Sequence, residues 1–382
     1  MSPISQYDKA PSPAFILEEA LLIRNLELIK SVRERAGVSI ILALKGFAMW
    51  PVFPLVGRYL SGATASSLHE ARLIFEEMGV KAHTYVPAYK PDEFEEILHY
   101  SSHITFNSVG QFHRYIDQVK AAPHGVSAGI RVNPEYSEVE VALYNPAAPG
   151  SRLGVDPAGF PKELPDGLEG LHFHTLCEST SHALEHVLAH FEERFGHFLP
   201  RLKWVNFGGG HLMTRKGYDI DHLVHILTRF RERYPNLEVT LEPGSAIAWE
   251  TGVLLATVLD IVDNHGVRTA MMDVSFTAHM PDTLEMPYRP RIRGARDPVE
   301  GYPACRIGGS SCLAGDYMPE YAFDQPLTIG RRIVFEDMIH YTMVKTTTFN
   351  GVGHPAICIL RSNGKLDVLR TFGYEDFKRR LG

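Results

Sequence analysis

The feature that most constrains the fold is a regular alternation of short apolar runs with amphipathic stretches through the first two thirds of the chain. Short apolar runs are typical of buried strands, and apolar residues at every third or fourth position are typical of helices. Alternating strands and helices indicate a parallel sheet, and eight repeats favour a closed barrel over an open sheet. The predicted strands cover residues 40–45, 62–66, 83–86, 104–107, 128–132, 170–174, 204–207 and 239–241.

The connections between these strands are mostly amphipathic and therefore predict helices. The predicted helices cover residues 67–78, 91–100, 109–120, 181–198 and 220–234. One connection differs, because residues 133–165 are rich in proline and glycine and show no clean helical pattern. We predict a long loop there, after the fifth strand, and loops of this kind often carry function.

The pattern changes after Gly252. Residues 253–262 read as a long, β-branched strand, and turn signals at 264–266 and 363–364 separate some of the later apolar runs. These shorter predicted strands cover residues 270–274, 326–329, 332–335, 356–360 and 365–369. We therefore predict an α/β chain, with a (β/α)8 TIM-type barrel over residues 18–250 and a mostly β domain formed by residues 1–17 and 251–382.

Composition narrows the functional classes. At 45% hydrophobic and 22% charged residues, the 382-residue chain is typical of a soluble globular protein. Its net charge of -7 argues against nucleic-acid binding. The sequence shows neither an 18-residue apolar run nor a signal-peptide pattern, so we expect no membrane association. The cysteines form no Cys-x-x-Cys or zinc spacing, which leads us to expect a reduced, cytoplasmic protein.

Several reactive residues end predicted strands, where the active site of an eight-stranded barrel lies. Lys45 ends the first strand, Arg131 the fifth, His174 the sixth and Glu242 the eighth. A lysine after a buried strand is unfavourable unless it is paired or chemically used. Lys45 is either a residue whose chain extends out of the rim or an amine of lowered pKa that forms a Schiff base with an aldehyde cofactor.

The residues around this mouth suit a phosphorylated pyridine. Three glycines, Gly208, Gly209 and Gly210, follow the seventh strand and could offer their N–H groups to a phosphate, although a plain turn is the alternative. Glu242 could keep a pyridine nitrogen protonated, or it could form a rim ion pair with Arg131. His174 could stack on the ring or serve as a hydrogen-bonded core histidine.

A metal site is the other interpretation of the histidines. His172 and His174 point the same way along a strand, which metal ligands often do. No acidic partner lies at a matching spacing, so we expect no metal there. Lysine, phosphate loop, histidine and carboxylate together indicate pyridoxal 5′-phosphate (PLP) bound to a barrel.

At these residues the chain resembles the fold type III PLP-dependent decarboxylases, which include the ornithine, arginine and diaminopimelate decarboxylases. Within that group it is most similar to the carboxynorspermidine (carboxyspermidine) decarboxylases. The segments that carry the resemblance are residues 43–48, 172–178, 208–211, 241–244, 276–282 and 311–316. They occur in the expected order and span most of the chain.

The resemblance implies roles for the barrel residues. Lys45 would carry the cofactor as a Schiff base, and His174 would stack on its ring. The glycines at 208–210 would bind the phosphate, Glu242 would pair with the pyridine nitrogen, and Arg131 would belong to the same cofactor site.

The resemblance also implies roles for the second domain. Tyr341 would contact the phosphate, and Cys312 of a partner subunit would protonate the substrate carbon, so we expect a homodimer with shared active sites. From composition alone Cys312 would be a buried apolar cysteine. Glu178, Asp282 and Asp316 are spare acids that would meet the amines of a polyamine precursor, or else serve as surface or structural carboxylates.

Three departures from the family pattern bear on the substrate. Ser245 stands where many relatives have an arginine after Glu-Pro-Gly, Leu313 stands where ornithine-type relatives have an acid, and Cys177 replaces a serine. Diaminopimelate carries a second carboxylate, so its site should present an arginine. The expected reaction is decarboxylation of carboxynorspermidine or carboxyspermidine to norspermidine or spermidine in polyamine biosynthesis.

Three alternatives stay open. The first is a diaminopimelate or basic amino-acid decarboxylase, the second an amino-acid racemase on the same barrel, and the third a cofactor-free regulatory relative. Such regulatory proteins usually lose the lysine or the cysteine, and both are present here. The two triamine substrates differ by one methylene, worth about 1–3 kcal/mol in a pocket, so the sequence does not separate them.

Overall fold

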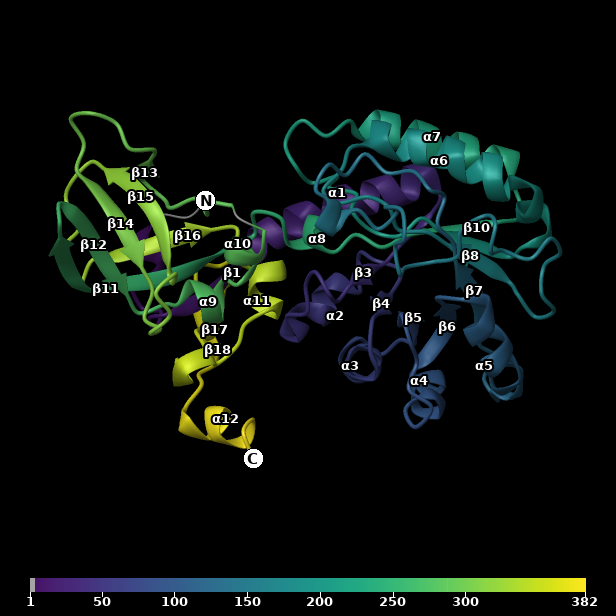
Figure 1. Cartoon of the computed structure of the whole chain (residues 1–382), viewed down its shortest axis with the longest axis horizontal. Helices are drawn as coiled ribbons and strands as arrows, with labels where there is room; N and C mark the ends of the chain where they lie inside the picture. The colour runs from purple at the N-terminus through teal and green to yellow at the C-terminus, as the bar shows by residue number, and fades with distance from the viewer. Residues whose placement is uncertain (1–3, 287) are drawn as a thin grey trace. The chain divides into compact units, whose positions relative to one another are not determined.

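A computed structural model describes residues 4–286 and 288–382 (Figure 1). The chain forms two compact units. One, which we call the barrel unit, comprises Asn25–Ile247; the other, the sheet unit, comprises Ala248–Gly382 together with the N-terminal segment that ends at Arg24. Among the described residues, no helix is both long enough and apolar enough to cross a membrane.

The barrel unit is built on a ring of parallel strands. Their order around the ring is β2-β10-β9-β8-β7-β6-β5-β4-β3. The segments are β2 (Ser39–Ile40), β3 (Leu42–Ala43), β4 (Ala63–Ala65), β5 (Ala82–Tyr85), β6 (Ser101–Phe106), β7 (Ser127–Arg131), β8 (Gly170–His172), β9 (Trp204–Asn206) and β10 (Glu238–Leu241).

The ring closes through its first strand. β2 pairs with β10 and β3 pairs with β4, and only Ile41 separates the two segments. The Ile41 N–H donates to the Leu241 carbonyl at 3.0 Å, and the Leu42 N–H donates to the Gly62 carbonyl at 3.0 Å. β2 and β3 are therefore two halves of one strand, which confirms the predicted closed barrel of eight strands.

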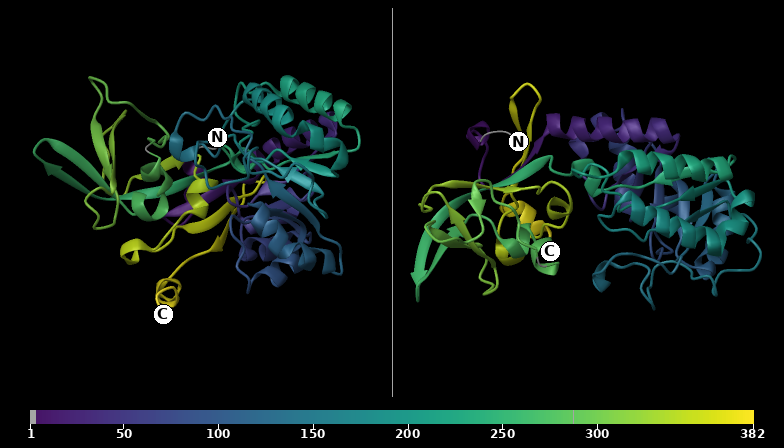
Figure 2. Two further views of the ribbon diagram at one scale, coloured as in Figure 1. Left: turned by 45° about the vertical axis from the view of Figure 1, so that its right-hand side comes forward. Right: turned by 90° about the horizontal axis from the view of Figure 1, so that it is seen from above.

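Helices join most of these strands, as predicted. They are α1 (Glu19–Ala36), α2 (Phe53–Val56), α3 (Leu68–Met78), α4 (Phe94–Tyr100), α5 (Val109–Ala121), α6 (Ser181–Phe195), α7 (Ile220–Arg233) and α8 (Ser245–Ala248). Side chains at the N-caps fix four of the starts, because Ser67, Ser108, Thr180 and Asp219 each accept a hydrogen bond from a backbone N–H of the first turn. α6 and α7 lie side by side (Figures 1 and 2).

The connection between β7 and β8 is the exception, as expected. Its only helical piece among the described residues is a short 3-10 turn at Ala142–Tyr144. An isolated bridge between Val132 and Val155 ties part of this loop back to the end of β7. The predicted long loop after the fifth strand is therefore confirmed.

Strand alternation separates the barrel's outer layer from its interior. The Phe173 ring packs on Phe191 of α6, at 4.7 Å between centroids, and on Phe207 at 5.2 Å. Because successive side chains on a strand point to opposite faces, His172 and His174 on either side of Phe173 face the interior. The same geometry turns Asn206 inward beside Phe207.

The sheet unit contains a nine-stranded mixed sheet. Its order is β13-β15-β14-β12-β11-β1-β17-β18, and β16 also pairs with β11. The strands are β1 (Ala14–Glu18), β11 (Gly252–Asn264), β12 (Val267–Met272), β13 (Ala295–Arg296), β14 (Ala304–Gly308), β15 (Tyr317–Phe323), β16 (Arg332–Glu336), β17 (Ala356–Leu360) and β18 (Leu366–Arg370). The mostly β character of this part of the chain is confirmed.

Two hairpin turns in this sheet follow the sequence signals. β11 and β12 join through His265 and Gly266, whose φ angles of 49° and 81° fit the left-handed conformation of a tight hairpin turn. β17 and β18 join around Gly364, with φ 82°. The N-terminal strand β1 lies between β11, to which it is antiparallel, and β17, to which it is parallel.

The predicted strand at residues 326–329 was wrong. This segment forms the turn between β15 and β16, where the Gly330 N–H donates to the Val258 carbonyl at 2.8 Å and the Arg331 N–H donates to the Thr328 carbonyl at 3.0 Å. Pro326 has no N–H to contribute to a ladder, and Ile329 is 64% exposed. Sequence reasoning also missed β1, β13, β14, β15 and the short helices α9 (Phe276–His279), α10 (Asp282–Glu285), α11 (Tyr341–Val344) and α12 (Tyr374–Arg379).

Two histidines inside the barrel make its stability sensitive to acid. The rings of His83 on β5 and His103 on β6 stack at 3.8 Å. Burial lowers the pKa of His83 to about 3, with His103 adding to the effect, and burial lowers the pKa of His103 to about 4. An unfolded histidine titrates near pH 6.5, so below that pH the unfolded chain binds more protons than the folded one.

We therefore expect the free energy of unfolding to be fully retained above about pH 6.5 and to fall as the pH drops towards about 4. The limiting slope is about 1.4 kcal/mol per pH unit for each histidine. Urea unfolding followed by circular dichroism, repeated between about pH 6.5 and about pH 4, measures this slope. The variant His83→Leu should show a shallower slope, whereas His113→Leu, at an exposed position on α5, should not. Equal slopes in all three proteins would contradict this assignment.

Candidate active site

Lys45 lies in a tight turn immediately after β3. The Ala43 carbonyl accepts hydrogen bonds from the N–H groups of Gly46, at 3.1 Å, and Phe47, at 3.3 Å. A Cβ at Gly46 would lie 2.8 Å from the Gly244 Cα, so this turn packs against the turn after β10 and only glycine fits. The backbone therefore holds Lys45 at the C-terminal end of its strand, close to the end of β10.

The Lys45 amine is directed into the barrel mouth. Its Nζ lies 3.4 Å from Nε2 of His174. The side chain is open to solvent, yet the barrel wall still removes much of its hydration, and this desolvation together with the nearby Arg131 lowers the pKa of Lys45. Glu242 and Cys177 oppose the effect without cancelling it. A larger share of neutral amine follows, which is the form that attacks a carbonyl.

His174 is held in one orientation as a neutral ring. Its Nδ1 accepts a hydrogen bond from the Gly209 N–H at 3.0 Å, which leaves Nε2 facing Lys45. Burial, together with the charges of Lys45 and Arg131, places the pKa of His174 well below its usual value. Arg131 in turn donates from Nη2 to the His174 carbonyl at 3.0 Å, and its guanidinium lies 4.8 Å from the Tyr85 ring centroid.

Glu242, directly after β10, is a largely buried anion. Asn206 donates from Nδ2 to its Oε1 at 2.6 Å, and its Oε2 lies 3.5 Å from Nε2 of His172. Burial alone would raise the pKa of Glu242, but His172 and Asn206 outweigh it and lower the pKa to about 2. The contacts of Glu242 therefore run to His172 and Asn206, and not to Arg131 as the rim-pair alternative supposed.

The glycine loop after β9 packs tightly against backbone. Gly208 and Gly210 have φ angles of 70° and 89°, in the left-handed region that favours glycine. A Cβ at Gly209 would lie 2.5 Å from the Glu242 carbonyl oxygen, and one at Gly210 would lie 2.2 Å from the Leu176 carbonyl oxygen. The neighbouring backbone therefore leaves no room for a side chain at any of the three glycines.

Two amides of this loop already have acceptors inside the protein. The Gly208 N–H donates to Oδ1 of Asn206 at 2.8 Å, and the Gly209 N–H donates to His174. Asn206 thus joins the carboxylate of Glu242 to the glycine loop. Sequence reasoning gave His172 no role beside Glu242 and did not single out Asn206. Each is a polar, inward-facing residue that lies two positions before a predicted site residue.

Glu178 lies on the segment that follows His174. It is exposed, and its φ of 46° places it in the left-handed region, where a glutamate is strained by about 1 kcal/mol or more. Burial raises the pKa of the neighbouring Cys177 thiol, and the charge of Glu178 adds to this shift. Backbone strain of this kind is concentrated at functional segments.

Asp282, at the start of α10 in the sheet unit, is a buried carboxylate with one oxygen left open. Its Oδ2 accepts hydrogen bonds from the Tyr288 hydroxyl at 2.7 Å and from Oγ1 of Thr342 at 2.8 Å. Its Oδ1 is buried and has no hydrogen-bond partner among the described residues. Thr342 follows Tyr341 directly on α11, so Asp282 and Tyr341 belong to one neighbourhood.

Asp316 has a structural environment. Its Oδ1 accepts from the N–H groups of Phe276, at 2.7 Å, and Thr277, at 3.1 Å, and its Oδ2 accepts from the Ser311 N–H at 3.0 Å. The carboxylate therefore fixes the start of α9 and the loop that carries Cys312. Cys312 is exposed, and its N–H donates to Oδ1 of Asn350 at 2.7 Å.

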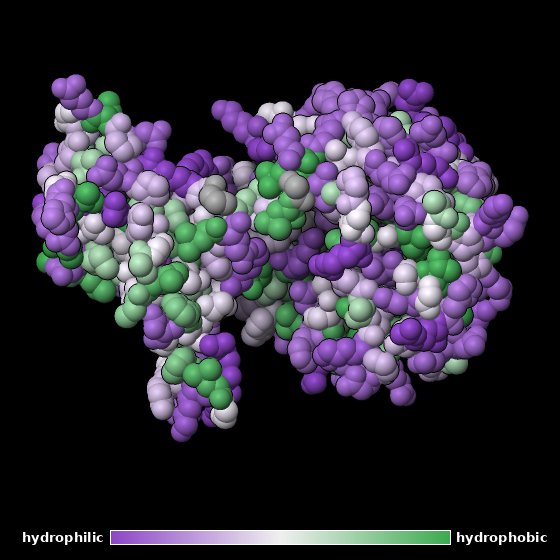
Figure 3. All heavy atoms as spheres, viewed as in Figure 1, coloured by the Kyte–Doolittle hydropathy of each residue, from purple (hydrophilic) through white to green (hydrophobic). Residues whose placement is uncertain are grey.

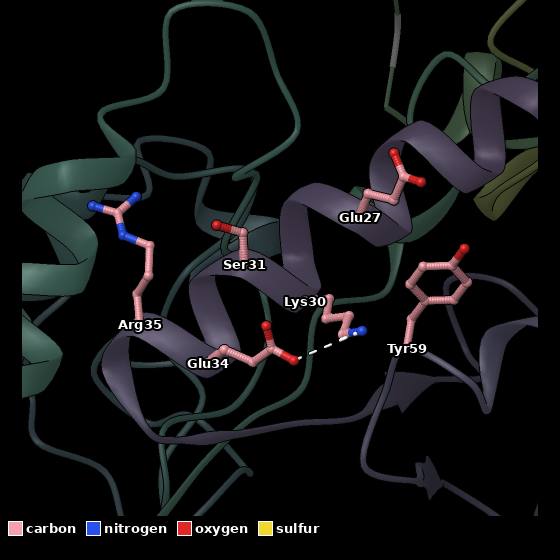
Figure 4. A pocket seen from close by; sticks show the side chains of 6 residues that line it. All are labelled: Glu27, Lys30, Ser31, Glu34, Arg35 and Tyr59. Atoms are coloured by element: carbon pink, nitrogen blue, oxygen red, sulfur yellow. Dashed lines mark ion pairs between the residues drawn. The ribbon is translucent and has the colours of Figure 1, made fainter.

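A hollow of about 390 Å³ lies elsewhere on the barrel unit, along α1 (Figure 4). Its lining residues are Glu27, Lys30, Ser31, Glu34, Arg35 and Tyr59. Lys30 pairs with Glu34 at 3.8 Å and Arg35 pairs with Asp221 at 2.5 Å, so its charges compensate one another. It contains none of the predicted site residues.

The chain matches a protein-family model described as "Pyridoxal-dependent decarboxylase, C-terminal sheet domain" over residues 15–339. It is 46% identical, over 385 residues, to the carboxynorspermidine/carboxyspermidine decarboxylase of Campylobacter jejuni, covering 98% of this chain and 99% of the relative. The chain belongs to this family of pyridoxal-dependent decarboxylases.

One further sequence relative and two solved structures are also similar to this decarboxylase. A carboxyaminopropylagmatine decarboxylase of Synechocystis is 55% identical over 372 residues, covering 97% of this chain and 96% of the relative. The crystal structure of the Campylobacter jejuni carboxynorspermidine decarboxylase complexed with norspermidine superposes with a TM-score of 0.90, at 44% identity, covering 97% of this chain and 99% of that one. A diaminopimelate decarboxylase from Helicobacter pylori, at 17% identity and a TM-score of 0.83, shares the fold.

The cofactor of the family is PLP, and the barrel mouth suits it. Glu242 has a pKa of about 2 and so stays anionic, and an anion can keep a nearby pyridine nitrogen protonated. The amine of lowered pKa at Lys45 and the neutral ring of His174 lie in the same cluster. The family membership identifies this chain as a PLP-dependent decarboxylase.

Removing the charge of Glu242 tests the cofactor site. In Glu242→Gln the pyridine nitrogen loses its anionic partner, and loss of one member of a buried pair costs about 3–5 kcal/mol, which corresponds to PLP binding weaker by roughly 10²–10⁴-fold. Titration of the apoenzyme with PLP, followed by the visible absorbance of the bound cofactor, measures this. The matched control is Glu238→Gln, an exposed position on the same strand. Unchanged affinity in Glu242→Gln would contradict the assignment.

Proposed function

We propose that this enzyme removes the α-carboxylate of a carboxylated aminopropyl polyamine precursor, with carboxynorspermidine and carboxyspermidine as the first candidates and norspermidine and spermidine as their products. The single observation that carries the proposal is the buried Asp282 with its open Oδ1, which suits a cationic group away from the reacting carbon. Family membership supports the reaction type. Carboxyaminopropylagmatine, whose far end is a guanidinium group, is a second candidate because the 55% identical relative is named for it.

The barrel residues have distinct tasks in this proposal. When bound, PLP supplies an aldehyde that links to amines and a ring that accepts the electrons released as the carboxylate leaves as carbon dioxide. Lys45 would hold the cofactor through its amine, which its lowered pKa favours. His174 would lie against the ring of the cofactor, and Glu242 would keep a proton on the pyridine nitrogen.

The resemblance to the family supports the proposed contacts to the phosphate. The glycines at 208–210 approach closely because they have no side chains, and Tyr341 adds a hydroxyl group. Arg131 supplies positive charge to the mouth and donates a hydrogen bond to the His174 carbonyl. This hydrogen bond keeps the His174 imidazole in place. Ser245, where many relatives have arginine, begins α8 and is 8% exposed, so it offers only a small neutral group to this region.

Cys312 is proposed to deliver a proton to the carbon that loses the carboxylate, in the active site of a partner subunit. Cysteine is among the most buried residue types, yet Cys312 is exposed in the single chain, beside Leu313, which is 46% exposed. Most of the exposed large apolar side chains among the described residues belong to the sheet unit, and Figure 3 shows hydrophobic patches over it. Such surface suits burial against a second copy of the chain.

The acidic residues are proposed to recognise the amines of the substrate. Asp282 would pair through Oδ1 with the far ammonium or guanidinium group, while Tyr288 and Thr342 hold Oδ2. Glu178 would meet a second amine at the barrel mouth. Asp316 differs from the expectation of an amine contact, because its oxygens serve the backbone of α9 and the Cys312 loop.

A substrate panel tests the proposed reaction. We expect carbon dioxide release, with PLP present, from carboxynorspermidine, carboxyspermidine and carboxyaminopropylagmatine, and much weaker release from diaminopimelate, ornithine and arginine. The ranking among the first three distinguishes an amine from a guanidinium at the far end. A preference for diaminopimelate or ornithine would overturn the substrate class and leave the cofactor assignment intact.

The variant Asp282→Asn tests the distal contact. A hydrogen bond to a charged group contributes about 1.5–3 kcal/mol, so we expect KM to rise roughly 10–100-fold with little change in kcat. Tyr288→Phe removes one hydrogen bond to the other oxygen without removing the charge and should have a smaller effect. Glu285→Gln, on the same helix and more exposed, is the matched control. A KM unchanged in Asp282→Asn would sink the proposed role.

A further inference from the structure

Three potential metal ligands meet on the outer face of the barrel unit, at the N-terminal ends of α6 and α7. His182 and Glu185 lie on α6 and His222 lies on α7, and one ligand atom of each lies within 4.8 Å of the others. Nε2 of His222 lies 3.1 Å from Oε2 of Glu185. The rings of His182 and His222 stack with centroids 4.1 Å apart and planes inclined by 22°. We propose that these three side chains bind a divalent transition-metal ion such as Zn²⁺.

The surrounding structure orients these ligands in advance. Nδ1 of His222 lies 3.0 Å from Oγ of Ser181, a fully buried residue, and this hydrogen bond turns Nε2 towards Glu185. A second partner on the other ring nitrogen is the usual arrangement for a metal-binding histidine. His182 and Glu185 are three residues apart on one helix and therefore share a face. The caps at Thr180 and Asp219 fix both helix starts.

The ligand set selects the kind of ion. Two imidazoles and one carboxylate, with a position open to water, suit Zn²⁺ and its neighbours, whereas Mg²⁺ and Ca²⁺ prefer oxygen ligands. Bond lengths of about 2.0–2.2 Å require the ligand atoms to move closer than they are now. His182 and Glu185 are exposed, so their side chains are free to adjust.

Nearby charged groups are engaged elsewhere and are not ligands. His186, on the next turn of α6, lies 2.6 Å from Glu138, and Asp221 pairs with Arg35. An exposed Glu185–His222 ion pair alone would contribute only about 0–1 kcal/mol. A metal ion shared by all three side chains requires the exposed His182 to rotate out of this ring stack, because a coordinating imidazole nitrogen points its lone pair within the ring plane.

A metal at this position would join the segments that follow β8 and β9. Ser179, just before the α6 cap, donates its N–H to the Gly210 carbonyl at 2.8 Å. α6 therefore begins next to the glycine loop, and α7 follows that loop along the chain. An ion that links the two helix starts would stabilise this side of the barrel mouth, independently of which substrate the enzyme takes.

Direct binding measurements test the site. The tag-free holoenzyme, freed of excess PLP and of metals by dialysis against a chelator, is titrated with Zn²⁺ by calorimetry. We expect one tight equivalent per chain, weakened roughly tenfold or more in His222→Gln and Glu185→Gln. His225→Gln, an exposed histidine one turn further along α7, should bind as the wild type does. Equal binding by wild type and His222→Gln would overturn the proposal.

Thermal stability gives a second readout that does not depend on activity. A ligand that binds only the folded state raises Tm, so Zn²⁺ should stabilise the wild type and the His225→Gln variant. His182→Gln changes an exposed side chain and should preserve the fold while losing most of this increase. An increase in Tm that persists undiminished in His182→Gln would contradict the site.

Discussion

The closure of the barrel through its first strand is the constraint on which the active site depends. Because one half of that strand pairs with β10 and the other half with β4, the turn after β3 must lie beside the turn after β10. The Ala43 N–H donates to the Pro243 carbonyl at 3.1 Å, and Gly46 packs on Gly244 without space for a Cβ. These backbone contacts place Lys45 and Glu242, from opposite ends of the barrel sequence, at one mouth.

The electrostatics of the mouth follow from that placement. Glu242 is a buried anion whose pKa of about 2 depends on His172 and Asn206, while desolvation and Arg131 lower the pKa of Lys45. Glu242 is therefore held as an anion, and a larger share of Lys45 is the neutral amine. A cofactor with a cationic ring nitrogen and an aldehyde complements both groups.

Much of the barrel could be predicted from the sequence because its strands are short, apolar and separated by amphipathic helices. Lys45, His174 and Glu242 could be proposed from the sequence because a charged or polar residue that ends a buried strand is conspicuous. His172 and Asn206 were missed, since their role depends on the register that brings β8, β9 and β10 side by side. The sequence left open whether Asp316 contacts substrate or is structural, because its donors are backbone amides of a helix far away in sequence.

The sheet unit was harder to predict because its pairings are distant in sequence. β1, from the N-terminal segment, lies between β11 and β17, and no local pattern indicates that insertion. The proposed metal ligands are distant in the same sense, since His182 and His222 come from two helices that meet only in the folded barrel. A search for ligand spacing along the chain does not find such a site.

The most direct test of the central claim is to fix the cofactor to the protein with borohydride and to locate the modified residue by peptide mass spectrometry. A Schiff base reduced in this way becomes a stable bond to the lysine that carries it. We expect the cofactor on Lys45 in the wild-type protein and no labelling of a Lys45→Ala variant. Labelling of a different lysine in the wild-type protein would contradict the placement of the active site at this barrel mouth.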